Sequence, residues 1–438
     1  MNRRTFIAQT GTVLGTALVT QAARTVTAEE PESKSLALHR QVGVFDAYTK
    51  PALKITRTGF EPGLFIERVE SLQAQLWRLR EGHVRMANMS IGVPRYQVPA
   101  TVEGQRPTSL PICSTEEEPR MIMRQLDAIY RSAEQQRGEM GIAQTVAEAE
   151  RLNADGKLAL YLHLTGAWIA DDLAVLRMYR RMGVVSIHPC LEGHLRMGDS
   201  AGDPRRHGGL TPLGKQVVQE MNRQRMVVDT AHGSDESIRD MVDASSAPTI
   251  FSHGCCAALC DNPRNITDER IRQTAAKGGV VCIAFVSAML SNLARQKGGR
   301  ADPAYLQEFA RADSELYERT RDPYAYLLER LNGTLLPTVF RRLGWPTEGK
   351  AAAAANRADI EQVVDHMMHV VKIAGIDHVA IGTDYESGDV PNELEHAGKL
   401  PNLTAALLRR GLSETDVTKV LIGNVKRVYH AVLDERPK

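Results

Sequence analysis

Three stretches of the chain, Met226-Val227-Val228-Asp229-Thr230-Ala231-His232, Pro248-Thr249-Ile250-Phe251-Ser252-His253 and Val379-Ala380-Ile381-Gly382-Thr383-Asp384, run apolar and then end on a metal-ligand type of side chain. Each stretch predicts a short buried strand, and a polar turn and a helical pattern follow it. Enzymes with a (β/α)8 barrel place catalytic side chains at the C-terminal ends of successive parallel strands. The three stretches therefore predict an active site at a barrel mouth, built from His232, His253 and Asp384.

The rest of the chain supports an α/β fold of the (β/α)8, or TIM barrel, class. Eight strand candidates, most of them followed by a helical pattern, lie at residues 42–48, 84–91, 158–165, 184–188, 226–231, 248–252, 279–285 and 378–384. This alternation favours a closed barrel over an open doubly wound sheet, and no glycine-rich dinucleotide or phosphate motif supports the open sheet. Residues 97–114, rich in Pro and Thr, predict a loop, and 287–356 predicts a long insertion between strands seven and eight that can act as a lid.

The first 28 residues have the features of an export signal. Arg3-Arg4 with Phe6 forms a twin-arginine motif, a mildly apolar stretch follows at 11–19, and Val26-Thr27-Ala28 offers a small-residue cleavage site. We expect residues 1–28 to direct the folded protein to the periplasm or the extracellular space. No other stretch approaches the ~20 apolar residues that a transmembrane helix needs, so we expect no transmembrane span.

Composition narrows the class of partner. The net charge is +1, with both signs interspersed, and this argues against nucleic acid as a partner. The six cysteines show no CxxC pair of zinc-finger spacing, and we expect no essential disulfide. A small-molecule substrate is the partner that remains, and the sequence leaves the oligomeric state open.

Longer motifs resemble one known family. Gly208-Gly209-Leu210-Thr211-Pro212, Ala258-Leu259-Cys260-Asp261-Asn262-Pro263-Arg264-Asn265 and Gly375-Ile376-Asp377-His378-Val379 are similar to segments of the membrane (renal) dipeptidase family, in the same order. The resemblance covers residues 42–438 and implies a single domain. It implies an amidohydrolase-like (β/α)8 barrel that holds two zinc ions and hydrolyses dipeptides.

The resemblance also implies roles for individual residues. His232 and His253 match the two histidine ligands of the second zinc. Arg264 matches the arginine that holds the substrate carboxylate. His188 matches the histidine that contacts the tetrahedral intermediate, and Asp384 matches the aspartate at the first zinc, which accepts a proton from the metal-bound water.

The chain departs from the family pattern at the first zinc. Tyr48 and Lys50 stand at the two positions of a His-x-Asp ligand pair, and Thr165 stands where the family has a bridging glutamate. A charged lysine cannot ligate zinc, and threonine cannot bridge two ions as a carboxylate does. We therefore expect at most one zinc ion per chain and an ion pair between Lys50 and Asp384. Tyr48 either hydrogen-bonds a substrate or serves as packing.

Several interpretations remain open at this stage. His163 either completes a three-histidine zinc site or, as we favour, is a buried hydrogen-bonded histidine. The leading functional hypothesis is an exported metal-dependent dipeptidase-like hydrolase acting on a dipeptide or related small amide with a free carboxylate. The alternatives are a non-catalytic descendant that binds a small carboxylate and a hydrolase that works without metal.

Overall fold

The structure, a computed structural model, describes residues 33–100, 107–297, 303–333, 335–344 and 356–434. The predicted export signal at 1–28 lies outside these residues. None of the described helices is long and apolar enough to cross a membrane. Helix α1 (Lys34–Val42) precedes the first barrel strand, and its His39 Nδ1 lies 2.7 Å from the Thr404 hydroxyl of α16 (Pro401–Arg409). The folded part of the chain therefore includes residues N-terminal to the expected boundary at 42.

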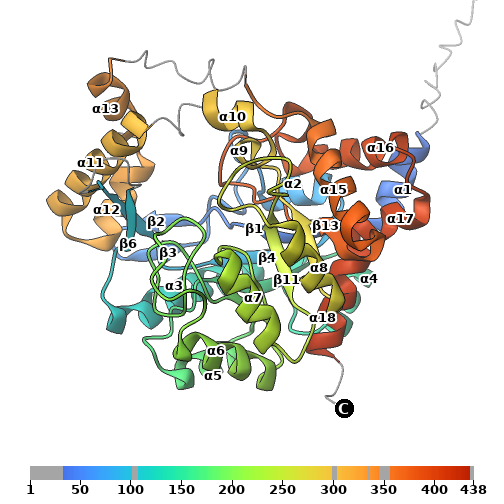
Figure 1. The fold of residues 1–438 in the computed structure, drawn as a ribbon, viewed down its shortest axis with the longest axis horizontal. Coiled ribbons are helices and arrows are strands. Elements are labelled where there is room, and N and C mark those ends of the chain that lie inside the picture. The colour runs from blue at the N-terminus through green and yellow to red at the C-terminus, as the bar shows by residue number, and fades with distance from the viewer. Residues whose placement is uncertain (1–32, 101–106, 298–302, 334, 345–355, 435–438) are drawn as a thin grey trace, which may run out of the picture. The chain divides into compact units, whose positions relative to one another are not determined.

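The predicted (β/α)8 barrel is confirmed (Figure 1). Its strands in the described chain are β1 (Val44–Thr49), β4 (Val84–Ile91), β8 (Leu158–Thr165), β9 (Val184–His188), β10 (Val227–Val228), β11 (Ile250–Gly254), β12 (Val280–Ile283) and β13 (Val379–Ile381). The first five of these strands pair in parallel in chain order, and so do the last three. Single parallel bridges, Asp229 to Ile250 and Thr49 to Tyr385, join the two sheets at both edges.

Amphipathic helices surround the strands, with their apolar faces buried. They are α3 (Glu118–Gln135), α4 (Val146–Ala154), α5 (Leu173–Arg181), α6 (Pro212–Arg223), α7 (Asp235–Ala244), α8 (Asp268–Ala276), α15 (Ile360–Ala374), α16, α17 (Glu414–Thr418) and α18 (Asn424–Leu433). Side chains fix several starts: Thr211, Ser234 and Thr267 each accept a hydrogen bond from a backbone amide of the first helical turn. These caps set where each helix leaves the loop that follows a strand, and thus where the loop residues lie.

Short elements fill the connections. They are α2 (Leu76–Glu81), the strands β2 (Lys54–Thr56), β3 (Gly59–Glu61), β5 (Arg95–Val98), β6 (Thr108–Pro111) and β7 (Met140–Ile142), and the turns η1 (Thr115–Glu117), η2 (Ile376–His378), η3 (Asn392–Leu394), η4 (Ala397–Lys399) and η5 (Lys419–Gly423). The loop prediction for 97–114 was wrong in part, because β5 and β6 pair as an antiparallel hairpin on either side of residues 101–106, which the structure does not describe.

The predicted insertion between strands seven and eight is confirmed. Its described part contains α9 (Ser287–Leu290), α10 (Asn292–Lys297), α11 (Pro303–Thr320), α12 (Pro323–Leu331) and α13 (Leu335–Arg342). Figure 1 shows α11, α12 and α13 grouped beside β6. The rings of Tyr96 in β5 and Tyr317 in α11 stack with centroids 4.0 Å apart, and the Gln97 amide donates to the Asp313 carboxylate at 2.9 Å. The hairpin therefore holds the insertion beside the barrel mouth.

Candidate functional site

The strand ends bring the predicted side chains together. The ring centroids of His188 and His232 are 4.7 Å apart, and those of His232 and His253 are 5.0 Å apart. The Tyr48 ring stacks on the His253 ring at 3.6 Å, and the Asp384 amide donates to the Tyr48 carbonyl at 3.0 Å. These five residues follow or end β1, β9, β10, β11 and β13, so they converge on one end of the barrel as predicted.

His232 and His253 face each other through their Nε2 atoms, which lie 3.0 Å apart. The Nδ1 atom of His232 lies 2.6 Å from the Glu192 carboxylate, and that of His253 lies 2.8 Å from the Ser252 hydroxyl. Burial, together with the nearby Arg264 guanidinium, lowers the pKa of His232 to about 3. The His232 ring is therefore neutral at ordinary pH, as a metal ligand must be. The contact of its Nδ1 atom with Glu192 is typical of histidines that bind a metal through the other ring nitrogen.

Two buried aspartates fix the backbone beneath these side chains. Asp46 accepts hydrogen bonds from the Tyr48 amide at 3.2 Å and from the amide of Thr383 at 2.9 Å. Asp229 accepts from the Ala231 and Ser252 amides, each at 3.0 Å. Burial raises the pKa of Asp46 to about 7 and that of Asp229 to about 6. Each carboxylate thus ties one strand end to the next and sets the direction of the side chain that follows.

The first metal position does not fit zinc. The Tyr48 hydroxyl is hydrogen-bonded to the Thr165 hydroxyl at 3.0 Å, and Thr165 is also bonded to the hydroxyl of Ser90. These are uncharged groups, and the Tyr48 ring is buried against His253. A hydrogen-bonded set of hydroxyls thus stands where the family resemblance places a ligand and a bridging carboxylate.

The second metal position offers two histidine nitrogens, one fewer than the three protein ligands that a catalytic zinc normally takes. Two nitrogens bound to one tetrahedral zinc lie roughly 3.3 Å apart, close to the 3.0 Å between the two Nε2 atoms. Among the residues that the structure describes, no group of three or more His, Cys, Asp or Glu is arranged to hold a metal. The remaining coordination positions would be left to water or substrate.

The predicted ion pair between Lys50 and Asp384 is present. The Lys50 ammonium lies 3.7 Å from the Asp384 carboxylate and donates to the Ser387 hydroxyl at 2.5 Å. Ser387 in turn donates to the same Asp384 oxygen. The Asp384 side chain is 6% exposed, and a buried carboxylate needs such a cationic partner. The ammonium therefore takes the place of a metal at this position.

Arg264 enters the site from the segment after β11. Its Nε lies 3.5 Å from a Glu192 oxygen, and its side chain is 11% exposed. The two terminal guanidinium nitrogens are buried and have no hydrogen-bond partner within the described part of the chain. Guanidinium nitrogens in that state favour a bidentate carboxylate ligand.

Glu192 was not predicted from the sequence, although it joins the predicted residues to one another. Besides His232 and Arg264, its carboxylate lies 3.6 Å from the Arg95 guanidinium of β5. Burial alone would raise the pKa of Glu192, but the hydrogen bond with the neutral His232 ring and the charges of Arg264 and Arg95 hold that pKa below its usual range. The residue lies in the irregular loop after β9, where no periodic pattern marks it; an acidic residue shortly after the strand-ending His188 was the available signal.

The two other histidines have different environments. His163 lies deeper, with Nδ1 2.7 Å from the Ser186 hydroxyl, and burial lowers its pKa to about 3. This agrees with a buried hydrogen-bonded histidine. His188 Nδ1 lies 3.2 Å from the Cys190 carbonyl, whereas its Nε2 is buried with no hydrogen-bond partner in the described chain. The Nε2 of His163 likewise lacks a hydrogen-bond partner there, but it faces the Asp229 carboxylate at 3.6 Å, whereas the ring of His188 stacks beside that of His232.

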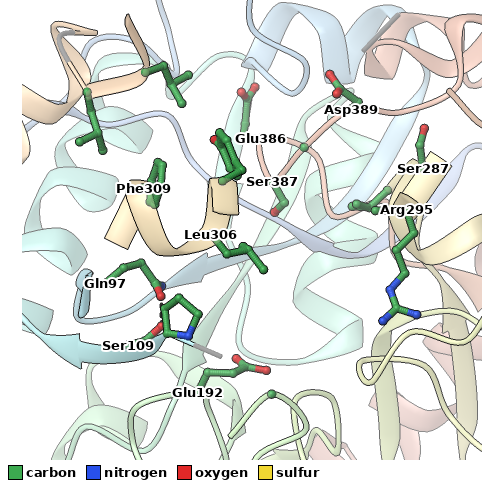
Figure 2. Close-up of a pocket in the computed structure, with 18 of the residues that line it drawn as sticks. Gln97, Ser109, Glu192, Ser287, Arg295, Leu306, Phe309, Glu386, Ser387 and Asp389 are labelled. Carbon is green, nitrogen blue, oxygen red and sulfur yellow. Dashed lines mark hydrogen bonds between the residues drawn. The ribbon is translucent and has the colours of Figure 1, made fainter. Parts of the chain in front are cut away.

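A cavity of about 1400 Å³ lies over the mouth and reaches the site (Figure 2). Glu192 and Ser387, which contact His232 and Asp384 respectively, are part of its lining. In Figure 2 they lie along the border of this space, which the hairpin residue Gln97 and the insertion residues Leu306 and Phe309 also line. The insertion thus forms one wall of the space above the site.

Comparison with known sequences identifies relatives of this chain. The family model described as membrane dipeptidase (peptidase family M19) matches residues 32–436. Dipeptidase tcpJ of Claviceps purpurea is 28% identical over 71% of this chain and 59% of its own length. Dipeptidase 3 of Rattus norvegicus is 28% identical over 67% of this chain and 49% of its own. The match therefore spans about half to three-fifths of these two relatives.

Comparison with solved structures shows the same fold. The probable dipeptidase PvdM from Pseudomonas aeruginosa has a TM-score of 0.68 at 24% identity, with 91% of this chain and 97% of that chain covered. A metallopeptidase from Rhodobacter sphaeroides, liganded with a phosphinate mimic of the dipeptide L-Ala-D-Ala, has a TM-score of 0.63 at 19% identity over 89% of this chain and 99% of its own. With a family model that matches nearly the whole described chain, the protein belongs to the membrane dipeptidase family, M19.

Proposed function

We propose that this protein is an exported, zinc-dependent hydrolase that cleaves a dipeptide or related small amide with a free carboxylate, using at most one zinc ion per chain. The observation that carries the proposal is the pair of neutral histidines, His232 and His253, whose Nε2 atoms lie 3.0 Å apart. Each ring is oriented by a hydrogen bond at its other nitrogen.

The residues around the pair suit this reaction. Arg264 would hold the substrate carboxylate with its two unpartnered nitrogens. When bound to the histidines, zinc supplies polarisation of a carbonyl and a more acidic water. Asp384 would accept a proton and His188 would contact the oxyanion. One Asp384 oxygen is already engaged by Lys50 and Ser387, so we expect slower turnover than a free carboxylate would allow.

The relatives and the N-terminal sequence support the substrate class and the location. The Rhodobacter sphaeroides structure holds a mimic of a dipeptide, which agrees with a small peptide-like substrate here. The Arg3-Arg4 motif and the small-residue cleavage site support export to the periplasm or beyond.

Metal content and hydrolysis test the proposal together. Protein purified without chelator should contain at most one zinc per chain, and a panel of dipeptides should be hydrolysed faster with added zinc than with a chelator. His253→Ala should lower both zinc content and hydrolysis, whereas His207→Ala, in the loop after β9, should change neither. Two zinc ions per chain, or full activity in His253→Ala, would contradict the proposal.

A second candidate is a non-catalytic protein that binds a small carboxylate. The hydroxyl set of Tyr48, Thr165 and Ser90 favours it, because it closes the first metal position without supplying a ligand. Tight, Arg264-dependent binding of a carboxylate without hydrolysis under any metal condition would establish this candidate instead.

A further inference from the structure

The space over the site is larger than a dipeptide needs. At about 1400 Å³ the cavity exceeds the roughly 300–1,000 Å³ that is typical of pockets for drug-sized ligands. It is continuous from Glu192 and Ser387 at the barrel mouth to the helices of the insertion. A ligand anchored at Arg264 would therefore leave most of the cavity unfilled unless it had an extension.

The wall that the insertion contributes is largely apolar. The residues that share this character come from α11, α12 and α13: Tyr305, Leu306, Phe309, Leu327, Leu331 and Leu335. Leu331 is 59% exposed. In Figure 2, Leu306 and Phe309 lie across the space from Ser387 and Glu386. An apolar group that reached this wall from the site would be removed from water on burial.

The cations beside the histidine pair, Arg264 and Lys50, disfavour a free amino group close to that pair. Lys50 adds an ammonium at the mouth, and its partner Asp384 is already engaged. The acidic side chains of the lining also have partners. Glu192 contacts His232 and Arg264, and Asp389 lies 3.6 Å from Arg357. Glu386 accepts hydrogen bonds from two backbone amides.

The fourth acidic residue of the lining is also engaged. Asp203 accepts hydrogen bonds from the Gly193 amide at 2.7 Å and the Ser200 hydroxyl at 2.8 Å. Of the four lining carboxylates, Glu192 and Asp389 are thus paired with arginines, whereas Asp203 and Glu386 are held by uncharged donors. A ligand whose nitrogen is acylated, and therefore uncharged, avoids repulsion from Lys50 and Arg264 beside the histidine pair.

We propose that the ligand of this site is an N-acylated amino acid or short N-acylated peptide. Its carboxylate binds Arg264, its amide lies at the His232–His253 pair, and its acyl group lies against the apolar wall formed by α11, α12 and α13. The inference rests on the proposed function because it uses the same carboxylate anchor.

A series of N-acylglycines tests the inference by calorimetric titration of the full mature protein. The series is N-acetyl-, N-butyryl-, N-hexanoyl- and N-octanoylglycine, and glycylglycine supplies the free ammonium. Affinity should rise by about two- to fourfold per methylene until the chain is fully in contact with the wall. N-acetylglycine should bind several-fold more tightly than glycylglycine.

Two variants locate the acyl group. Leu306→Gln should reduce the ratio of N-octanoylglycine to N-acetylglycine affinity at least fivefold. Met178 lies on α5 outside the cavity and is 48% exposed. Met178→Gln should therefore leave that ratio unchanged. If Leu306→Gln fails to fold, the wild-type series still decides, because a flat dependence on chain length overturns the inference.

The outcomes separate this inference from the function on which it rests. One outcome is that all ligands require Arg264 but N-octanoylglycine binds no more tightly than N-acetylglycine. The proposed contact of the acyl group with the apolar wall is then wrong, while binding of the carboxylate by Arg264 stands. Tighter binding of glycylglycine than of N-acetylglycine would show that the ligand is not N-acylated, and binding of the carboxylate by Arg264 would again stand. If binding of N-acetylglycine is unchanged in Arg264→Ala, the carboxylate anchor fails and the inference falls with it.

Discussion

Arg264 and Glu192 show how one residue prepares another in this site. Glu192 contacts the Nε of Arg264 and leaves the two terminal nitrogens without partners in the described chain. It also holds the Nδ1 side of His232. The same carboxylate therefore orients the group that would bind the substrate carboxylate and one of the two metal-type histidines, without occupying either binding position.

Replacing Arg264 by alanine should weaken binding of a small carboxylate far more than replacing an exposed arginine nearby. Hydrogen bonds to charged groups contribute about 1.5–3 kcal/mol, so Arg264→Ala should raise the Kd for N-acetylglycine by about ten- to a hundredfold. Arg206→Ala, in the loop after β9, is the matched control, because that side chain is exposed. Equal effects of the two substitutions would make Arg264 an ordinary structural residue.

Glu192→Gln should weaken zinc binding although Glu192 is not itself a ligand. The glutamine keeps the shape of the side chain but removes the charge that supports His232. Loss of such an outer partner typically lowers metal affinity by about 10–100-fold. Competition titration with a chromogenic chelator measures this, with Glu139→Gln, at a half-exposed surface position, as the control. Unchanged zinc affinity in Glu192→Gln would show that the histidine pair does not bind metal in this orientation.

The ends of β1 and β8 decide how many metals the barrel can hold. Tyr48→His, Lys50→Asp and Thr165→Glu together would restore the ligand types of the family at the first position, with Asp384 freed from Lys50. We expect zinc uptake, measured by elemental analysis, to rise above that of the natural protein. Lys50→Met alone should break the ion pair with Asp384 without raising zinc uptake, because it adds no ligand.

Two results of that experiment would change the conclusions. No rise in zinc uptake in the folded triple variant would mean that the strand ends no longer have the family's geometry. Dipeptide hydrolysis that appears only in the triple variant would show that the natural protein is not a dipeptidase.

The sequence was most informative where elements are regular. The strands β4, β8 and β9 have the predicted bounds, because uninterrupted buried runs leave little choice of register. β10 is limited to Val227–Val228, and Asp229 continues from it by a single parallel bridge to Ile250 of β11. The β5–β6 hairpin was missed because its strands are short and half-buried, so they lack an alternating pattern.

The site was predictable to the extent that its residues end strands. His188, His232, His253 and Asp384 could be placed because a strand fixes the direction of its last side chains. Glu192 and Arg95 come from a loop and from an unpredicted hairpin, and they reach the site through tertiary contacts. The resemblance to the family, and not periodicity, singled out Arg264. The insertion at 287–356 was expected near the barrel mouth, but which of its residues line the cavity was not predicted.

The molecule as a whole buries an unusual amount of polar, titratable surface at the barrel mouth. His163, His188 and His253 are almost fully buried there, and so are Asp46 and Asp229, while the side chain of His232 is 13% exposed. Buried groups of this kind cost stability unless they are neutral or hydrogen-bonded. The folded state therefore binds protons differently from the unfolded chain, and its stability must depend on pH.

The metal-free protein should lose stability as the pH falls from about 6.5 toward 4. Burial lowers the pKa of His39 to about 4 and that of His163, His194 and His232 to about 3, from 6.5. The unfolded chain therefore takes up protons that the folded chain refuses, so the histidine contribution is present above pH 6.5 and is lost below it. Asp46 and Asp229 act in the opposite sense, because their pKa values are raised to about 7 and 6 and the folded state is favoured when they are protonated.

Because the histidines outnumber these two aspartates, we expect a net loss of stability on acidification. Urea unfolding with a chelator present, at pH 7.5, 6.0 and 5.0, should show a falling free energy of unfolding. His39→Gln, at the contact of α1 with α16 and away from the barrel mouth, should reduce the slope between pH 6.5 and 4.5 by about 1.4 kcal/mol per pH unit. A free energy of unfolding that stays constant or rises between pH 7.5 and 5.0 would mean that the aspartates dominate, and that the histidines are not held neutral in the folded protein.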